Sequence, residues 1–525
     1  MISRMHSGYA YRAYDRYVAG AEARLRKGLP SIGVHDPQTV GERLIQRVVE
    51  LTLWPFVAAF ANDPSRAVED GGGRTVACDG ITIDPVSRST RIAFPRWLRS
   101  VGEFLLHWSH ITTAILSGVF AARSSSDRPV TLVFGIGRES LVYKHSDARF
   151  VDFCKNGPIP GLCKAQALIV QAPLPGFRSV APEWISYDRF PLHRLLSTRR
   201  LGFIGRLVIM AAQIRAFVAF MSAALRYPAL ALLARDLAYS YVVTALDRRG
   251  LIEAVIITNA TYSSQPLWMR SPDRRKFLVH MVWYSQNIQP MVYRADGLVS
   301  DLPNYRHVRA DRHWVWTWGF RTYLKKLGIS CPIDVIGPVL WYLPEAATPP
   351  DDDAVRVILF DITPVTDARA DQIGLIGNYY SAANMIRFIE ESLEVCLEVQ
   401  RQSGRRILLF LKHKRDYNSS HDPRFIELIG RLTAPGGGIS LLPAESNMFA
   451  SLGNATLAIV APYSSPAYVA DAVGTRAVFF DPTGELLPTF EKRPLISFAG
   501  GRDALLELLS AEVSYKPNIL SGSRT

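Results

Sequence analysis

Short apolar runs alternate with longer stretches of helical spacing through most of the chain. In its middle part, apolar runs at 131–134, 167–170, 254–257 and 333–336 predict strands. After residue 353 the alternation is regular and predicts strands at 355–360, 406–411, 439–442, 456–460 and 477–480, with helices at 381–402, 423–432, 447–452, 466–473 and 503–509. Short apolar strands separated by helices are typical of a parallel sheet covered on both faces. The pattern therefore predicts an α/β fold with doubly wound sheets.

Three other segments carry longer helical patterns. A helix is expected around 40–61, and the apolar stretches at 104–122 and 207–225 approach the length of a membrane span. A span needs about 20 apolar residues with few or no charges. Histidines interrupt the first stretch, and Gln213 and Arg215 interrupt the second. Both stretches are therefore interpreted as buried or interfacial helices.

A stretch rich in proline and aspartate at 349–353 is the clearest linker in the chain. The expected organisation is a helical N-terminal extension at 1–125, a Rossmann-like domain at 126–345 and a second Rossmann-like domain at 354–525. The first domain would bind an acceptor and the second a donor.

Composition and charge narrow the class of protein. Of the 525 residues, 48% are hydrophobic and 20% are charged, which excludes wholesale disorder. The 60 Lys and Arg exceed the 47 Asp and Glu, and the net charge of +13 predicts an anionic partner: nucleic acid, acidic lipid or a phosphorylated ligand. Five scattered cysteines favour reduced thiols, and the first 20 residues lack the apolar stretch of a signal peptide. A cytoplasmic location is expected.

Ligands of open parallel sheets bind outside the carboxyl ends of the strands. After the expected strand 456–460, Ser464 and Ser465 precede Pro466, the first residue of the next helix. A helix N-terminus with free N–H groups and two hydroxyls is suited to a phosphate. Alternatively, the two serines only cap the helix.

Three further loops of the second domain carry candidate ligand contacts. Lys412, His413 and Lys414 follow the strand 406–411, where they would create a positive field or form an ordinary solvated charge run. Asp361, after the strand 355–360, either contacts the same ligand or stabilises a turn. The carboxylates of Glu445 and Glu485 could accept hydrogen bonds from ribose hydroxyls. Together these loops favour a phosphorylated small ligand over nucleic acid.

The combination of His413 with a later Ser464–Ser465 pair resembles the nucleotide-binding half of GT-B glycosyltransferases that use CMP-activated sugars, such as bacterial sialyltransferases and Kdo transferases. In those families a His-Pro pair and a Ser-Ser or Ser-Thr pair hold the nucleotide and its phosphate. Here Lys414 stands in the place of the proline. The resemblance extends over about 355–510, and it implies two Rossmann-like domains facing a cleft, a CMP-linked donor and no metal.

Catalytic groups are expected in the first domain. Glu139 and Asp147 lie in a polar segment after the strand 131–134, where one carboxylate could deprotonate an acceptor hydroxyl or act as nucleophile; the alternative is a surface salt bridge for each. Amides and aromatics at 258–268 and 280–287 suit sugar binding, or else pack at the end of the sheet.

The arginines that precede the apolar stretch 207–225 could hold the protein on anionic lipid, or they are the solvated end of a core helix. These are Arg194, Arg199, Arg200 and Arg206. Neither a metal-binding motif nor a cofactor motif is recognised. The hypothesis is a metal-independent glycosyltransferase that moves a Kdo-like or sialic-like sugar from CMP to a glycan or lipid-linked glycan in capsule or lipopolysaccharide assembly. UDP-, GDP- or CDP-linked donors, or a non-catalytic carbohydrate-binding assembly protein, are the alternatives; no nucleic acid partner is expected.

Overall fold

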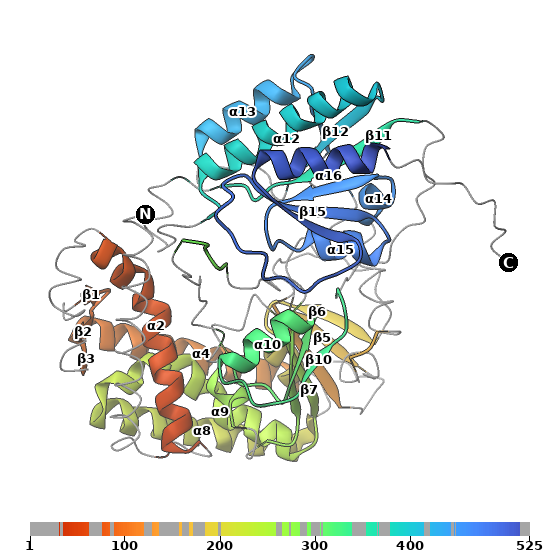
Figure 1. Cartoon of the computed structure of the whole chain (residues 1–525). Coiled ribbons are helices and arrows are strands. Elements are labelled where there is room, and N and C mark those ends of the chain that lie inside the picture. The colour runs from red at the N-terminus through yellow and green to blue at the C-terminus, as the bar shows by residue number, and fades with distance from the viewer. Residues whose placement is uncertain are drawn as a thin grey trace. The chain divides into compact units, whose positions relative to one another are not determined.

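The computed structural model describes residues 31, 35–61, 76–84, 89–119, 129–135, 157–159, 167–171, 184–197, 201–258, 265–271, 275–283, 291–295, 305, 308–338, 353–364, 366, 379–413, 421–442, 446 and 448–514. The chain divides into two compact units (Figure 1). Unit 1 comprises Met1–Ser285, Leu302–Tyr342 and Gln372–Ile376, and unit 2 comprises Gln286–Asp301, Leu343–Asp371 and Gly377–Thr525.

Unit 1 contains a seven-stranded, fully parallel sheet. Its strands are β4 (Val130–Phe134), β5 (Leu168–Gln171), β6 (Ile185–Asp188), β7 (Ile252–Thr258), β8 (Leu278–Val282), β9 (Arg312–Val315) and β10 (Ile333–Val335). They lie in the order β10-β9-β8-β7-β4-β5-β6. The direction of the strand order reverses between β4 and β7, as at the switch point of a Rossmann sheet.

The helices of unit 1 include the long apolar segments expected from the sequence. They are α2 (Pro37–Ala61), α4 (Phe94–Ser117), α7 (Pro191–Leu196), α8 (Gly202–Arg226), η3 (Pro228–Leu233), α9 (Ala234–Arg248), η4 (Leu267–Met269) and α10 (Trp318–Lys326). Helix α4 begins ten residues before the expected start, because Pro95 occupies its first turn and fixes a helical backbone there. The N-terminal part also contains strands that were not expected: β1 (Val76–Cys78), β2 (Ile81–Asp84) and β3 (Ser89–Ile92), which form an antiparallel sheet.

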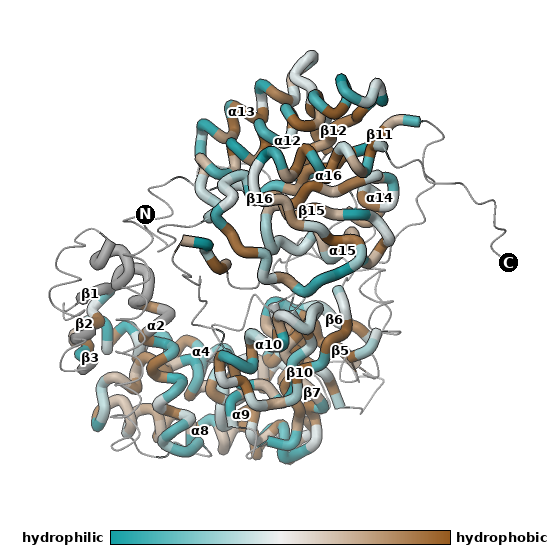
Figure 2. The backbone as a smooth tube through the Cα atoms, in the orientation of Figure 1, coloured by the Kyte–Doolittle hydropathy of each residue, from teal (hydrophilic) through white to brown (hydrophobic). Residues whose placement is uncertain are grey.

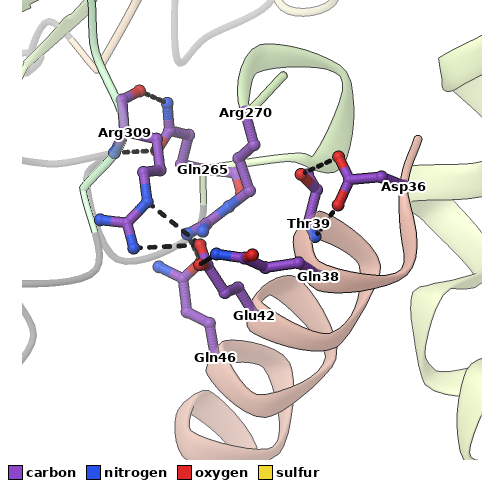
Figure 3. Close-up of polar contacts among 8 residues, drawn as sticks. All are labelled: Asp36, Gln38, Thr39, Glu42, Gln46, Gln265, Arg270 and Arg309. Atoms are coloured by element: carbon purple, nitrogen blue, oxygen red, sulfur yellow. Dashed lines mark hydrogen bonds and ion pairs between the residues drawn. The ribbon is translucent and has the colours of Figure 1, made fainter. Parts of the chain in front are cut away.

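A polar network fastens α2 to the rest of unit 1 (Figure 3). The guanidinium of Arg309 lies 3.0 Å from the Glu42 carboxylate, and Gln46 accepts a hydrogen bond from Arg270. Arg43, on the same helix, forms a buried ion pair of 3.0 Å with Asp236 of α9. These contacts make α2 part of the packed structure of unit 1.

Unit 2 contains a six-stranded parallel sheet in the order β13-β12-β11-β14-β15-β16, with the strand order again reversing beside its first strand. The strands are β11 (Val355–Phe360), β12 (Ile407–Lys412), β13 (Ser440–Leu442), β14 (Leu457–Val460), β15 (Arg476–Asp481) and β16 (Ile496–Gly500). The helices are α12 (Ala382–Ser403), α13 (Pro423–Thr433), α14 (Met448–Gly453), α15 (Pro466–Ala472) and α16 (Arg502–Ser514).

Figure 2 shows hydrophobic residues along the strands of both sheets, which form the cores of the two units. The predicted fold class is confirmed: each unit is built on a doubly wound sheet of Rossmann type, the domain composition of the GT-B class. The alternating tryptophans at 311–318 are typical of a buried strand, and β9 lies there. Three other strands of these sheets were not predicted. In β6, β8 and β16, polar or glycine residues interrupt the apolar run that marks the other strands.

Candidate functional site

The switch point of unit 2 lies between β11 and β14, and it brings together the loops singled out in the sequence. Phe360 at the end of β11 pairs with Lys412 of β12 on one side and with Val460 of β14 on the other. Neighbouring strands of a sheet are about 4.8 Å apart. The residues that follow these three strands therefore leave the same edge of the sheet side by side, where a Rossmann domain binds its ligand.

Asp361, Lys412 and His413 are all buried at this edge. The Lys412 ammonium donates a hydrogen bond to the His413 carbonyl (3.3 Å), and the Asp361 carboxylate accepts one from the Thr363 hydroxyl (3.4 Å). The amide of Asp422 also donates to the Pro364 carbonyl (3.0 Å), which ties the loop after β12 to the loop after β11. Burying a lysine and a carboxylate is costly in free energy unless they are well solvated by polar partners. Lys412 and His413 are thus not part of a solvated charge run.

The turn after β14 holds a residue in a backbone conformation that L-amino acids rarely adopt. Tyr463 has φ of +61°, and such a non-glycine residue costs about 1–3 kcal/mol, so surrounding contacts must stabilise it. The Tyr463 hydroxyl donates to the Leu487 carbonyl, and the Tyr380 hydroxyl donates to the Pro462 carbonyl (2.6 Å). Strain of this kind gathers at ligand-binding sites.

The two serines of this turn have different roles. The Ser464 hydroxyl donates to the Ala461 carbonyl (2.8 Å) and closes the turn. Ser465 is the residue before α15, but its side chain does not cap the helix, and its hydroxyl makes no hydrogen bond with any residue that the structure describes. The interpretation that both serines only cap the helix is therefore wrong.

A buried carboxylate supports the turn from the adjacent strand. Asp481, at the end of β15, accepts hydrogen bonds from the Tyr379 hydroxyl (2.6 Å) and from the amides of Thr483 (3.0 Å) and Leu486 (2.8 Å). Burial, together with the Asp481 charge, raises the pKa of Tyr379, so its hydroxyl remains a donor. Glu485 is exposed in the loop that Asp481 organises. Tyr379, Tyr380 and Tyr463 were not predicted as site residues, although a tyrosine pair directly precedes Ser381, the N-cap of α12.

The structure thus brings Asp361, Lys412, His413, Ser464 and Ser465 to one edge of the unit 2 sheet. Four other predicted residues lie outside the described residues: Lys414, Glu445, Glu139 and Asp147. The segment that carries Glu139 and Asp147 begins after Gly135, at the switch point of the unit 1 sheet. There the Thr258 hydroxyl donates to the Gly135 carbonyl, and Gly135 adopts φ of +79°.

Of the aromatic residues interpreted either as sugar contacts or as packing at the end of the unit 1 sheet, Trp268 and Trp283 pack in the core, and Tyr262 and Tyr284 lie outside the described residues. Trp268 and Trp283 are buried, and the Trp283 indole donates to Nδ1 of His313 (3.0 Å). The Trp314 indole donates to Nδ1 of His280 in the same way (3.2 Å). Burial lowers the pKa of His280 to about 4 and that of His313 to about 3, so both are neutral acceptors near pH 7.

Two further expectations concern metals and membranes. Within the described ranges, no group of three His, Cys, Asp or Glu side chains is placed to hold a metal ion. Two helical segments, Gly202–Arg226 and Pro228–Arg248, have the length and apolar composition of a membrane span, and most of the second is buried. Arg206 was interpreted either as a lipid contact or as part of the solvated end of a core helix. It is buried and donates to the Ile115 and Gly118 carbonyls at the end of α4, so both interpretations are wrong for this residue.

Comparison with solved structures finds distant similarities. The wall teichoic acid polymerase TagF shares 11% identity over 79% of this chain and 87% of its own, with a TM-score of 0.35. UDP-GlcNAc 2-epimerase of Methanocaldococcus jannaschii shares 10% identity over 74% and 93%, with a TM-score of 0.33. TarM shares 13% identity over 54% and 52%, with a TM-score of 0.31. With TM-scores this low, no substrate or mechanism is carried over from these structures.

The comparison of sequences gives a more direct result. No curated protein matches the chain. The family described as polysaccharide biosynthesis PFTS motif protein matches residues 213–509, more than half of the chain, including the whole site at the edge of the unit 2 sheet. The chain therefore belongs to the PFTS motif proteins of polysaccharide biosynthesis.

Proposed function

We propose that the chain is a glycosyltransferase that uses a nucleotide-activated sugar to extend or modify a surface polysaccharide. The observation that carries the proposal is the edge of the unit 2 sheet, where a buried lysine, a buried histidine and an unengaged serine hydroxyl converge on a Rossmann switch point. Membership in a polysaccharide biosynthesis family supports a sugar as the transferred group.

In this proposal His413 and Ser465 donate hydrogen bonds to the donor phosphate, while Ser464 fixes the turn between them and the helix. Lys412 and Lys414 supply positive charge that stabilises the leaving phosphate as the glycosidic bond to it breaks. The carboxylates of Asp361 and Glu445 contact donor hydroxyls. A CMP-linked Kdo-like or sialic-like sugar is the preferred donor, because the His413 and Ser464–Ser465 combination resembles transferases of that class.

The acceptor would bind to unit 1, where Glu139 or Asp147 takes the proton of the attacking hydroxyl or attacks the sugar itself. Both residues belong to the segment that leaves the unit 1 switch point, a place where Rossmann domains present their functional loops. The acceptor is a glycan or a lipid-linked glycan at the cytoplasmic face of the membrane.

Calorimetry with CMP, CDP, UDP and GDP tests the donor site. We expect one of them to bind, and His413→Ala to weaken that binding at least tenfold, because a lost hydrogen bond to a charged group costs about 1.5–3 kcal/mol. His110→Ala, an exposed histidine of α4, is the matched control and should bind as the unaltered protein does.

The outcomes separate the parts of the proposal. Binding of UDP rather than CMP would support the location of the donor site but contradict a CMP-linked donor. If none of the four nucleotides binds, the donor site is wrong. A protein that binds a nucleotide but neither hydrolyses nor transfers any sugar from a pooled set of nucleotide sugars would be a binding protein and not an enzyme.

A further inference from the structure

Helix α8 exposes a broad apolar surface. Opposite its buried side it carries Phe203, Ile204, Leu207, Ile214, Val218 and Leu225, of which Phe203 and Ile204 are 76% and 72% exposed. We call these six residues the α8 apolar face. The adjacent helix α4 exposes Leu98, Leu105, Leu106 and Leu116 as well. A surface helix of a soluble protein normally places polar and charged residues on its outer side, so a surface of this kind marks an interaction site.

The buried side of α8 is held to unit 1 by polar contacts. Arg206 donates to the Ile115 (2.6 Å) and Gly118 (2.7 Å) carbonyls, which satisfies backbone groups left open at the end of α4. Seven residues further along α8, the side-chain amide of Gln213 donates to the Trp108 carbonyl (2.5 Å). Because buried polar contacts run along this side, α8 stays packed in unit 1 and offers only its outer face to a lipid phase, as interfacial helices do.

Positive charge lies directly beside the α8 apolar face. A pocket of about 360 Å³ between α8 and α9 is lined by Arg215, Arg248, Arg249 and Tyr241. None of the three guanidinium groups has a hydrogen bond or an ion pair with a residue in the described ranges. Arg249 lies over Gly205, where a Cβ atom would come within 3.1 Å of its Nη2. Arginine forks of this kind bind phosphate oxygens in pairs.

We infer that α8 lies in the surface of a bilayer that contains anionic phospholipid, with its apolar face among the acyl chains and a lipid phosphate in the pocket formed by Arg215, Arg248 and Arg249. Charge favours lipid over another copy of this chain: α8 contains no Asp or Glu, and a self-complementary interface would place these arginines near one another without carboxylates from the helix. These three arginines take the place of Arg206 as candidate lipid contacts, and lipid binding at α8 does not depend on the donor site of unit 2.

Flotation of the full chain with vesicles tests the inference. Phosphatidylcholine vesicles with and without phosphatidylglycerol are compared, and we expect binding only when the anionic lipid is present. The triple change Arg215→Gln, Arg248→Gln and Arg249→Gln should lower the partition coefficient about 100-fold, since each basic residue near an anionic surface contributes about fivefold. Ile214→Gln with Val218→Gln should lower it as well, through the lost apolar insertion.

Matched controls lie on unit 2. Arg401→Gln, Arg406→Gln and Arg431→Gln remove the same charge from exposed positions, and Leu397→Gln with Leu441→Gln removes exposed apolar side chains. Both controls should bind vesicles as the unaltered chain does. Thermal unfolding of each variant tests whether it is folded.

Three results would overturn the inference: no flotation of the unaltered chain, an equal loss in the control triple, or a dimer without lipid that Ile214→Gln with Val218→Gln converts to a monomer. The last result would assign the α8 apolar face to a second copy of the chain.

Discussion

At the scale of single residues, the turn after β14 separates the roles of two adjacent serines. The Ser464 hydroxyl closes the turn, so Ser464→Ala should lower the free energy of unfolding by about 1 kcal/mol. The Ser465 hydroxyl has no such contact, so Ser465→Ala should change stability by less than about 0.5 kcal/mol but weaken nucleotide binding about tenfold. Denaturant unfolding and calorimetry measure the two effects. Equal losses of stability would show that Ser465 also supports the fold.

Tyr463 in the same turn permits a second test. Tyr463→Phe keeps the ring but removes a hydroxyl that donates to Leu487 and accepts from the Thr489 amide (3.2 Å). We expect a loss of about 1–2 kcal/mol in the free energy of unfolding and weaker nucleotide binding, because the strained turn loses a support. Tyr241→Phe, in unit 1, is a control whose nucleotide affinity should be unchanged. An unaltered affinity in Tyr463→Phe would mean that the turn does not shape the site.

At the scale of elements, the ion pair between Arg43 of α2 and Asp236 of α9 fixes the N-terminal helix. Burial raises the pKa of Asp236, but the Arg43 charge and hydrogen bonds outweigh it and hold that pKa below its usual range. Asp236→Asn removes the carboxylate that balances the charge of the buried Arg43 guanidinium and should cost about 3–5 kcal/mol of stability. Glu390→Gln, which disrupts an exposed pair with Arg431, should cost about 1 kcal/mol or less. Chemical denaturation compares the two variants, and equal costs would contradict the structural role of the buried pair.

The elements also show what the sequence could predict. Five of the six strands of unit 2 were predicted within a residue or two. The four central ones, β11, β12, β14 and β15, have apolar runs because central parallel strands are covered on both faces. Edge strand β16 was missed because Ser497 and Gly500 break its run. Asp361, Lys412 and His413 could be predicted because they directly follow such strands.

The supports of the site could not be predicted in the same way. The left-handed conformation of Tyr463 depends on contacts with Leu487 and Thr489, which are distant in the sequence. A glycine at this position would have indicated that conformation, but the residue is a tyrosine. Burial of Trp283 and Arg206 likewise depends on which helices and strands pack around them. Sequence patterns locate strand ends, whereas the direction and burial of individual side chains follow from tertiary packing.

At the scale of the whole molecule, the two units should respond differently to acid. Burial is the first cause of a lowered pKa for four histidines, all in unit 1: His107, His193 and His280, each to about 4, and His313, to about 3. The pKa of a histidine in the unfolded chain is about 6.5. When burial lowers the pKa in the folded state, the full stability of the fold is present above pH 6.5, and it is lost as the pH drops from 6.5 toward the pKa of the folded state. Unit 1 should therefore weaken well above pH 4.

All ten tryptophans belong to unit 1, so tryptophan fluorescence follows that unit alone, while far-ultraviolet circular dichroism follows both. Near pH 7 we expect the two signals to report similar unfolding midpoints. At pH 5.5 the midpoint from fluorescence should be lower than the midpoint from circular dichroism. Each fully buried histidine contributes about 1.4 kcal/mol of lost stability per pH unit below 6.5. His313→Gln, which keeps an acceptor for Trp283, should reduce this pH dependence by that amount. Coincident midpoints at pH 5.5 would mean that these buried histidines do not control the acid response of unit 1.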